Sequence, residues 1–167
     1  KQNGKQGFFF YQQMELDFSE DEVTGKDLGL IAHALSESGR YNGALNLDYR
    51  EFAKIYEYMN HLNERYKHHC FLIMVSIDTA PGSVTYTENR EYALACMEQA
   101  IHEKIRKVDI CTRYSSMQYL IILFEADETK ISKVMDRIFM QYYKQYDKSN
   151  FIPKYEYIPM MEDREEQ

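Results

Sequence analysis

The chain has 167 residues, and its hydrophobic content of 44% and aromatic content of 14% are enough for the core of one ordinary domain. Its formal charge of −7 argues against a nucleic-acid partner, because nucleic acid requires a basic surface. The longest apolar run, Cys70 to Val75, is far shorter than the ~20 residues that span a bilayer, so we expect no membrane segment.

The cysteines indicate a reducing compartment and no metal site. Cys70, Cys96 and Cys111 lie in apolar stretches without paired spacing, which is typical of reduced, buried thiols. His68 and His69 precede Cys70 directly, and consecutive residues of a strand alternate faces, so these three side chains cannot converge on one ion. We therefore expect a cytoplasmic protein with no cofactor and no bound metal.

The N-terminal part of the chain is predicted to contain one strand and one helix. The aromatic-rich stretch from Phe8 to Leu16 is typical of a strand, and Thr24 can cap a helix that runs to about Ser36. The breaker cluster from Ser38 to Gly43 then separates this part from the rest.

A domain boundary is expected at this breaker cluster. The predicted division is an N-terminal extension or linker to an upstream domain over residues 1–42, the main domain over 43–160, and an acidic tail over 161–167.

The main domain is predicted to follow the order helix, strand, helix, hairpin, helix, strand. After a short extended piece at Ala44–Leu47, the apolar periodicities predict these elements: a helix capped by Asp48 and ending near Tyr66, a strand at Cys70–Ile77 buried on both faces, a helix at Asn89–Arg106, a hairpin at Asp109–Phe124, a helix capped by Asp127 and extending through Tyr142, and a strand at Lys154–Ile158. This order predicts an α+β fold with a mostly antiparallel sheet of about five strands flanked by helices.

The hairpin is the most informative stretch of the chain. Arg113 and Tyr114 precede a polar turn, Ser115 to Gln118, and Tyr119 follows it. This stretch resembles the hairpin of diguanylate cyclase (GGDEF) domains, in which Arg-Tyr is followed by Gly-Gly, two acids and Phe. The resemblance implies the palm-like fold of nucleotidyl cyclases.

Three further matches extend the resemblance over about Gly43 to Pro159. Ser76-Ile77-Asp78 lies where the family has Asp-x-Asp, and Arg106 to Asp109 matches the Arg-x-x-Asp pattern upstream of the hairpin. Leu47 to Phe52 is similar to the family's Asn-Arg-x-x-Phe.

The chemistry that the resemblance implies joins two GTP molecules, with divalent metals held by carboxylates. The corresponding positions here are Ser76, Met117 and Gln118, and none of these can be an anionic ligand of a hard cation. Ser115 and Ser116 replace the glycine pair that lets backbone approach the nucleotide. We therefore expect no enzymatic activity and no catalytic residues.

The segment after the apolar strand also differs from the family. Thr79 to Thr85 stands in place of the base-binding segment, and no Lys or Arg occurs between Lys67 and Arg90 to hold phosphates. Asp78 is retained, but we expect it to bond to amides of this loop, since one carboxylate alone seldom retains magnesium.

Arg106 and Asp109 are the candidate ligand-binding residues. In the family this pair forms an inhibitory site for cyclic di-GMP, because Arg can donate two hydrogen bonds to a guanine edge and Asp can accept from the opposite edge. The alternative is structural: an Arg that ends a helix and an Asp that fixes the entry to the next strand.

These features predict a non-catalytic GGDEF-like signalling module in a bacterial response regulator or related signal-transduction protein, located in the cytoplasm. We expect it to act through a protein partner or through self-association, behind a sensor or receiver domain. A receptor for cyclic di-GMP or another nucleotide is the alternative, and an active diguanylate cyclase is the third hypothesis.

Overall fold

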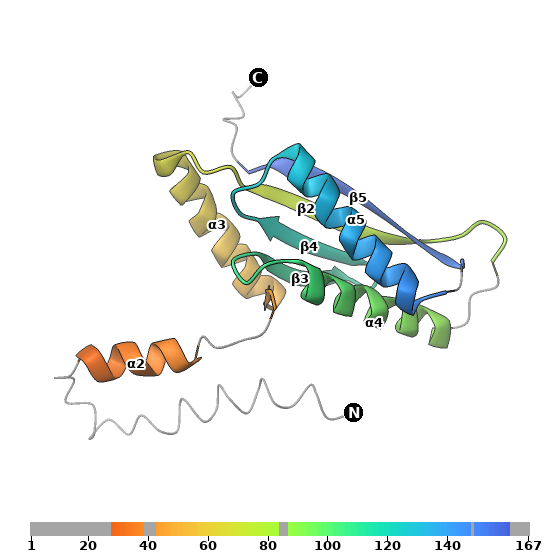
Figure 1. Cartoon of the computed structure of the whole chain (residues 1–167), viewed down its shortest axis with the longest axis horizontal. Coiled ribbons are helices and arrows are strands. Elements are labelled where there is room, and N and C mark those ends of the chain that lie inside the picture. Colours follow the sequence, from red (N-terminus) through yellow and green to blue (C-terminus); the bar gives the residue numbers. More distant parts are fainter. Residues whose placement is uncertain (1–27, 39–42, 84–86, 148, 161–167) are drawn as a thin grey trace. The chain divides into compact units, whose positions relative to one another are not determined.

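The computed structural model of the chain describes residues 28–38, 43–83, 87–147 and 149–160 (Figure 1). The chain divides into two units, residues 1–40 and 41–167, and each is described by itself. In the first unit the structure describes helix α2 (Leu28–Ser38), which ends near the predicted position. The strand expected at Phe8–Leu16, the start of the helix at Thr24 and the acidic tail lie outside the described residues. The division into domains stays a prediction.

The second unit confirms the predicted order of elements. It contains β1 (Leu45–Asn46), α3 (Tyr49–Tyr66), β2 (Phe71–Thr79), α4 (Thr87–Lys104), β3 (Ile110–Ser115), β4 (Gln118–Leu123), α5 (Glu128–Gln145) and β5 (Phe151–Pro159). The strands form one five-stranded sheet in the order β1-β3-β4-β2-β5. Only β1 and β3 pair in parallel, so the sheet is mostly antiparallel and the fold is α+β, as expected.

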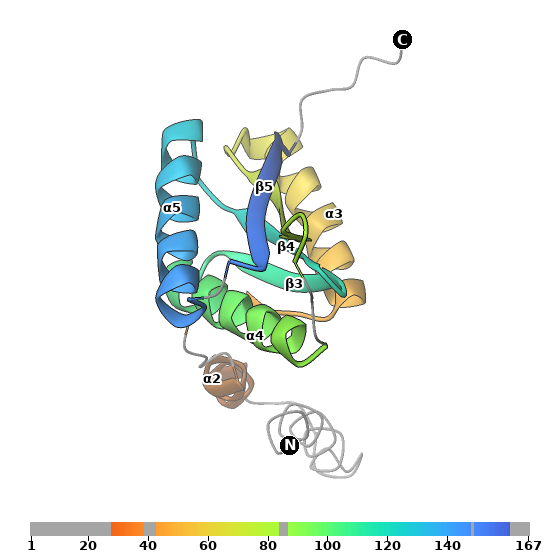
Figure 2. The same ribbon diagram turned by 90° about the vertical axis from the view of Figure 1, so that its right-hand side faces the viewer.

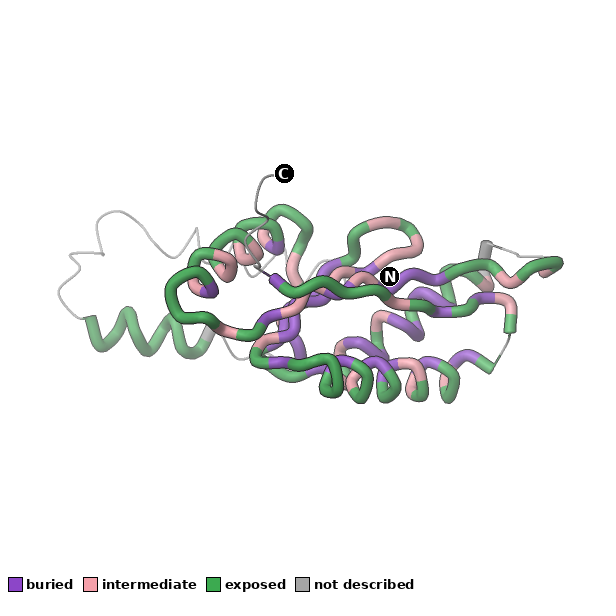
Figure 3. Tube along the Cα trace, turned by 90° about the horizontal axis from the view of Figure 1, so that it is seen from above, coloured by how far each residue is buried: buried purple, intermediate pink, exposed green. Residues whose placement is uncertain are grey.

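Helices α3, α4 and α5 of the second unit cover both faces of the sheet (Figure 2). On one face, α4 and α5 pack with the sheet residues Ile73, Val75 and Ile121 around a large hydrophobic core. On the other face, α3 packs through Phe52 against a smaller cluster that contains Ile122. Figure 3 shows the buried residues gathered between the sheet and these helices.

The helix starts follow from the capping residues that the sequence predicts. The carboxylate of Asp48 accepts a hydrogen bond from the backbone N–H of Glu51 at 2.9 Å, and that of Asp127 accepts from Lys130 at 2.8 Å. Each bond satisfies one of the amides that the first helical turn leaves unpaired. By contrast, α4 spans Thr87–Lys104 and ends two residues before the predicted position, Arg106.

Two strands are longer than predicted because they pair with each other. β2 continues through Thr79, which lies opposite Phe151, and β5 begins at Phe151 and not at Lys154. The expectation that β2 is buried on both faces is confirmed fully for one face and in part for the other. Ile73 and Val75 are buried against α4 and α5, whereas on the opposite face Ser76 is buried and Leu72 and Met74 are half-buried.

One glycine fixes the place where the chain enters the domain. Gly43 has φ of +82°, and a Cβ at this position would lie 2.7 Å from the backbone oxygen of His102. A side chain here would therefore displace the start of β1. Within the described ranges, no helix has the length and apolar character needed to cross a membrane.

Candidate functional site

The structure brings together the three positions that correspond to the family's acids. Strands β3 and β4 join through a turn in which Ser115 lies opposite Gln118, with an irregularity in the pairing between Arg113 and Ser115. The tip of this hairpin adjoins the end of β2, because Ser76 lies opposite Gln118 and the N–H of Ile77 donates to the carbonyl of Met117 at 3.0 Å.

A network of neutral hydrogen bonds occupies this junction. The amide nitrogen of Gln118 lies 3.4 Å from the hydroxyl of Ser76 and 3.4 Å from the sulfur of Met74. The hydroxyl of Ser115 donates to the amide oxygen of Gln118 at 3.0 Å and accepts from the N–H of Met117 at 3.3 Å. Uncharged side chains thus satisfy one another at the positions where the hairpin that this one resembles has acids.

The residues that frame the turn have structural contacts. Arg113 donates from Nε to the carbonyl of Ser115 and from Nη2 to that of Ser116, at 3.3 and 3.4 Å. Tyr119 is buried and donates to the carbonyl of Leu94 in α4 at 3.0 Å. Burial raises the pKa of Tyr119, so the phenol remains a hydrogen-bond donor. The frame therefore holds the turn and ties the hairpin to α4.

The remaining acid of this region is engaged by a cation. A carboxylate oxygen of Asp78 lies 2.6 Å from Nζ of Lys154, a partner that the sequence did not predict. This contact raises the pKa of Lys154. The antiparallel pairing of β2 with β5 places the two side chains close together. Among the described residues, no group of three or more His, Cys, Asp or Glu side chains could hold a metal ion.

Arg106 and Asp109 form a clamp at the other end of the hairpin. Asp109 is only 1% exposed, and its carboxylate accepts from the N–H, Nε and Nη2 of Arg106 at 2.9, 3.0 and 3.0 Å. It also accepts from the N–H of Phe124 at 3.1 Å, and Nη2 of Arg106 donates to the carbonyl of Phe124. These four donors satisfy the carboxylate. The geometry agrees with the structural alternative, and a role of the pair in ligand binding stays a prediction.

A cationic cavity lies beside this clamp. It has a volume of about 470 Å³, and its charged lining residues are Arg106, Lys130, Lys133, Arg137 and a single acid, Asp136. Leu123, Ala126 and Val134 complete its lining. Two of these four cations are paired with acids, Arg106 with Asp109 and Lys130 with Asp127 at 3.8 Å. Lys133 and Arg137 add further positive charge, in a chain of net charge −7, so the cavity is suited to an anionic ligand.

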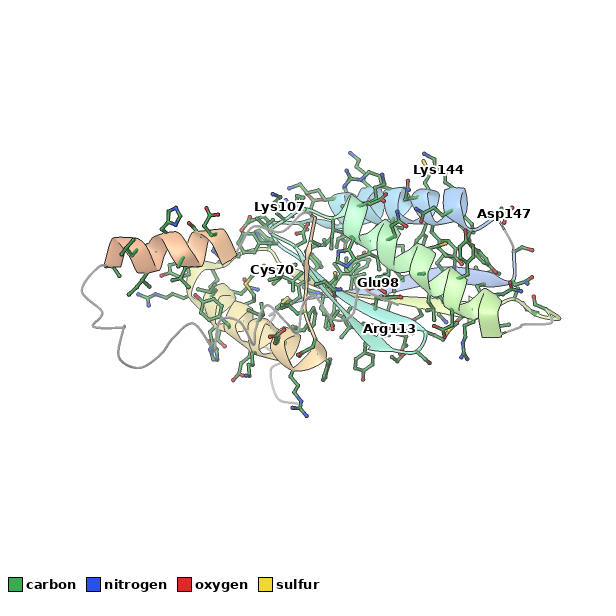
Figure 4. All side chains as sticks on the ribbon, turned by 90° about the horizontal axis from the view of Figure 1, so that it is seen from below. Cys70, Glu98, Lys107, Arg113, Lys144 and Asp147 are labelled. Carbon is green, nitrogen blue, oxygen red and sulfur yellow. The ribbon has the colours of Figure 1, made fainter. Side chains whose placement is uncertain are left out.

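Sequence reasoning missed three of these cations. Lys130, Lys133 and Arg137 recur on α5 at intervals of three and four residues, which places them on one stripe of the helix. That spacing could have indicated a cationic stripe on the helix, but only the fold shows that the stripe lies beside Arg106. In Figure 4, Lys107, which follows Arg106, and Arg113 lie far apart, so the cavity and the hairpin tip are separate regions.

Two solved structures place this fold among the diguanylate cyclases. A DGC protein from Thermotoga maritima matches with a TM-score of 0.56 and 15% identity, over 70% of this chain and 82% of its own length. The diguanylate cyclase SiaD of Pseudomonas aeruginosa, in complex with its activator SiaC, matches with a TM-score of 0.55 and 14% identity, over 90% of this chain and 68% of its own. No family model and no curated protein matches the sequence. At these identities the likeness shows the fold.

Proposed function

Since the domain has the fold of the diguanylate cyclase (GGDEF) proteins, we propose that it is a non-catalytic GGDEF-like signalling module that acts through protein contacts or dimerisation. The observation that carries this proposal is the neutral network of Ser76, Ser115 and Gln118 at the hairpin tip. In the family, the acids at this place hold the divalent metals that stabilise the transferred phosphoryl charge.

The chemistry of hard cations supports this proposal. Magnesium binds through carboxylates and phosphates in near-octahedral geometry. At the hairpin tip the amide oxygen of Gln118 is neutral and accepts from Ser115, while Asp78 is paired with Lys154. A metal–GTP complex would have to break these contacts and would gain no pair of carboxylates in exchange.

The test is incubation with GTP and magnesium, followed by measurement of pyrophosphate release. We expect no release above a blank without protein. Release that depends on protein concentration and is lost in the variant Asp78→Asn would overturn the proposal, because it would show turnover through the one acid left in this region. The third hypothesis, an active cyclase, would then take its place.

The proposed setting is the cytoplasm of a bacterium, in a response regulator or related signalling protein. The bacterial sources of both similar structures support it, and the complex of SiaD with its activator supports regulation through a protein partner. Free, buried Cys70, Cys96 and Cys111 agree with a reducing compartment. Light scattering on the full chain would measure self-association directly.

A receptor for cyclic di-GMP is the second candidate function, and the cationic cavity favours it. Lys130, Lys133 and Arg137 surround Arg106 with charges that could bind the two phosphates of such a ligand. The Arg106 side chain is 54% exposed, whereas that of Asp109 is 1% exposed and its carboxylate accepts four hydrogen bonds. We therefore expect Arg106 to contact the ligand and Asp109 to position Arg106.

Titration calorimetry with cyclic di-GMP tests this second function. Binding by the unmodified chain that weakens about tenfold in Arg137→Ala would support it, since the variant removes one charged contact with the ligand. Gln118→Ala, at the other end of the hairpin, is the matched control and should bind as well as the unmodified chain. Absence of heat at all ligand concentrations would remove the receptor function.

A further inference from the structure

Strand β5 forms one edge of the sheet, with β2 as its neighbour (Figures 1 and 2). The N–H of Met160 donates to the carbonyl of Cys70, and that of Ala80 donates to the carbonyl of Asn150, each at 2.8 Å. In the register of β2 and β5, even-numbered residues of β5 thus direct their backbone groups to β2. The odd-numbered residues direct theirs outward: Phe151, Pro153, Tyr155, Tyr157 and Pro159.

The two faces of β5 differ in exposure. On the face toward α5, Tyr155 packs edge-on against Phe139 and Tyr157 against Phe71, with ring centroids 5.9 Å apart in both pairs. On the opposite face all four side chains are exposed, namely Ile152, Lys154, Glu156 and Ile158. In chain order these are apolar, positive, negative and apolar. Positions at equal distance on either side of Tyr155 are therefore both apolar (Ile152 and Ile158) or of opposite charge (Lys154 and Glu156).

We propose that β5 pairs antiparallel with β5 of a second copy of this chain, about a two-fold axis at Tyr155. This inference rests on the proposed function in its dimeric form, and it identifies the surface through which the two copies would associate. In this arrangement Lys154 faces Glu156 of the second copy and Ile152 faces its Ile158, and the symmetry makes each contact twice. Opposite charges and apolar pairs directly across two strands stabilise a sheet. The two five-stranded sheets become one.

The charge pattern selects this register over its neighbours. An axis at Lys154 or at Glu156 would place like charges directly opposite each other, which destabilises paired strands. An axis at Pro153 or Tyr157 would place an isoleucine opposite a charged side chain. Of these five registers, only the axis at Tyr155 matches both the charged and the apolar positions.

The prolines of β5 are compatible with the same register. Proline on an exposed strand ordinarily limits edge pairing, because it has no N–H to donate. With the axis at Tyr155, the two copies of Tyr155 exchange both of their backbone bonds, and the N–H of Tyr157 donates to the carbonyl of Pro153. An axis at Pro153 would lack both central donors. The prolines therefore disfavour that alternative and leave the proposed pairing with its central bonds.

Charge reversal with mixing tests the proposal on the full chain. Lys154→Glu alone and Glu156→Lys alone each place like charges across the axis twice, so we expect each to weaken self-association at least about tenfold. Lys154→Glu also removes the ion pair with Asp78 of its own chain, which Glu156→Lys leaves in place. An equimolar mixture of the two variants restores both opposite-charge pairs, and it should form dimers as readily as the unmodified chain. Sedimentation velocity over roughly micromolar to millimolar concentrations measures all of these states.

Matched reversals on α3, Lys54→Glu and Glu57→Lys, control for the change in net charge. Both residues are exposed, and neither lies on β5. They should leave self-association unchanged, and circular dichroism should show that every variant is folded. Dimerisation that no reversal on β5 weakens would overturn the proposed surface and leave the proposed function standing. A monomer at all concentrations would overturn the dimerisation branch as well, leaving contact with a different protein.

Disulfide cross-linking tests which residues of the two β5 strands lie opposite each other. Ile152 and Ile158 of the second copy would form a non-hydrogen-bonded pair with Cα atoms about 4.5 Å apart, which suits a disulfide. A mixture of Ile152→Cys and Ile158→Cys should give oxidised dimers. Ile152→Cys alone should not, because its two copies would lie roughly 20 Å apart. Equal cross-linking of the single variant and the mixture would contradict the two-fold axis at Tyr155.

Discussion

The two ends of the β3–β4 hairpin differ in the charge of the side chains that they bring together. At the tip, Ser76, Ser115 and Gln118 satisfy one another with neutral hydrogen bonds. At the open end, Asp109 is a buried carboxylate held by Arg106, and α5 adds further cations around a cavity. One hairpin can therefore carry neutral side chains at one end and charged ones at the other, since the strands between them need only pair and pack.

A physical asymmetry accounts for the difference. At the tip, neutral side chains can satisfy one another directly, whereas a carboxylate there would need a cation to offset its charge. The carboxylate of Asp109 instead closes the chain between α4 and β3 and binds the end of β4 through Phe124. Removal of this carboxylate would leave the backbone N–H groups of Arg106 and Phe124 without partners. The stability of the fold is therefore a sufficient reason for an acid at position 109.

The largest effect is expected from removal of the charge at the open end. Asp109→Ala should lower the free energy of unfolding by about 3 kcal/mol, because four donors lose a buried charged acceptor. Urea denaturation measures this loss. Asp136→Ala, an exposed acid of the same cavity, should change stability by less than ~0.5 kcal/mol. A loss below about 1 kcal/mol for Asp109→Ala would contradict a structural clamp.

The converse experiment adds charge to the tip. The double variant Ser76→Asp with Met117→Asp should lose roughly 2 kcal/mol of stability, since Ser76 is only 8% exposed and the new acids repel each other. Millimolar magnesium should return about 1 kcal/mol by binding the folded state. Thermal unfolding with and without magnesium measures both effects.

Two comparisons control that experiment. The double variant Ser76→Asn with Met117→Asn has similar size and no charge, so its melting temperature should not respond to magnesium. The unmodified chain should not respond either. A magnesium response in the unmodified chain would show that the neutral tip still binds a cation, and the contrast between the two ends would fail.

A smaller effect is expected when the neutral network is opened. Gln118→Ala removes the contacts to Ser76 and Ser115 and should cost about 1 kcal/mol, the usual contribution of such hydrogen bonds. Urea denaturation again measures it. Gln99→Ala removes a hydrogen bond on the exposed surface of α4 and is the control, with an expected change below ~0.5 kcal/mol. Equal losses in the two variants would mean that the tip network adds no more stability than one exposed hydrogen bond.

The smallest effect concerns repulsion in the cavity. Lys133→Glu places an acid four residues before Arg137 and three after Lys130, and it should stabilise the chain by about 0.4 kcal/mol at low salt. Chemical denaturation at low and at high ionic strength measures the gain, which should disappear at about 1 M salt through screening. A loss of stability at low salt would show that the attraction between Lys133 and Asp136 outweighs the repulsion of Lys133 by Lys130 and Arg137.

Local patterns predicted most of the fold, because the interactions that carry them are local. Asp48 and Asp127 cap helices through bonds three residues away, and the apolar stripes of α3 and α5 face the two cores. The polar turn of the hairpin lies between Ser115 and Gln118, as predicted.

The contacts that sequence reasoning missed join residues far apart in the chain. Asp78 meets Lys154 only because β5 returns beside β2, and Lys133 and Arg137 approach Arg106 only because α5 packs next to α4. The closure of Asp109 by the N–H of Phe124 likewise depends on how β3 and β4 pair. Spacing along the chain could identify each side chain but not its partner.

The short strand β1 is attached to β3 by hydrogen bonds whose resistance to a pulling force depends on the direction of that force. The N–H of Leu45 donates to the carbonyl of Asp109 at 3.2 Å, and that of Leu47 donates to the carbonyl of Cys111 at 3.0 Å. Tension along β1 would load these two bonds together, in shear, whereas a sideways pull would peel them apart from Leu45 onward. A force on the chain before β1 would thus act on Asp109, the residue that binds Arg106. The direction of this force would determine how much of it reaches the Arg106–Asp109 pair.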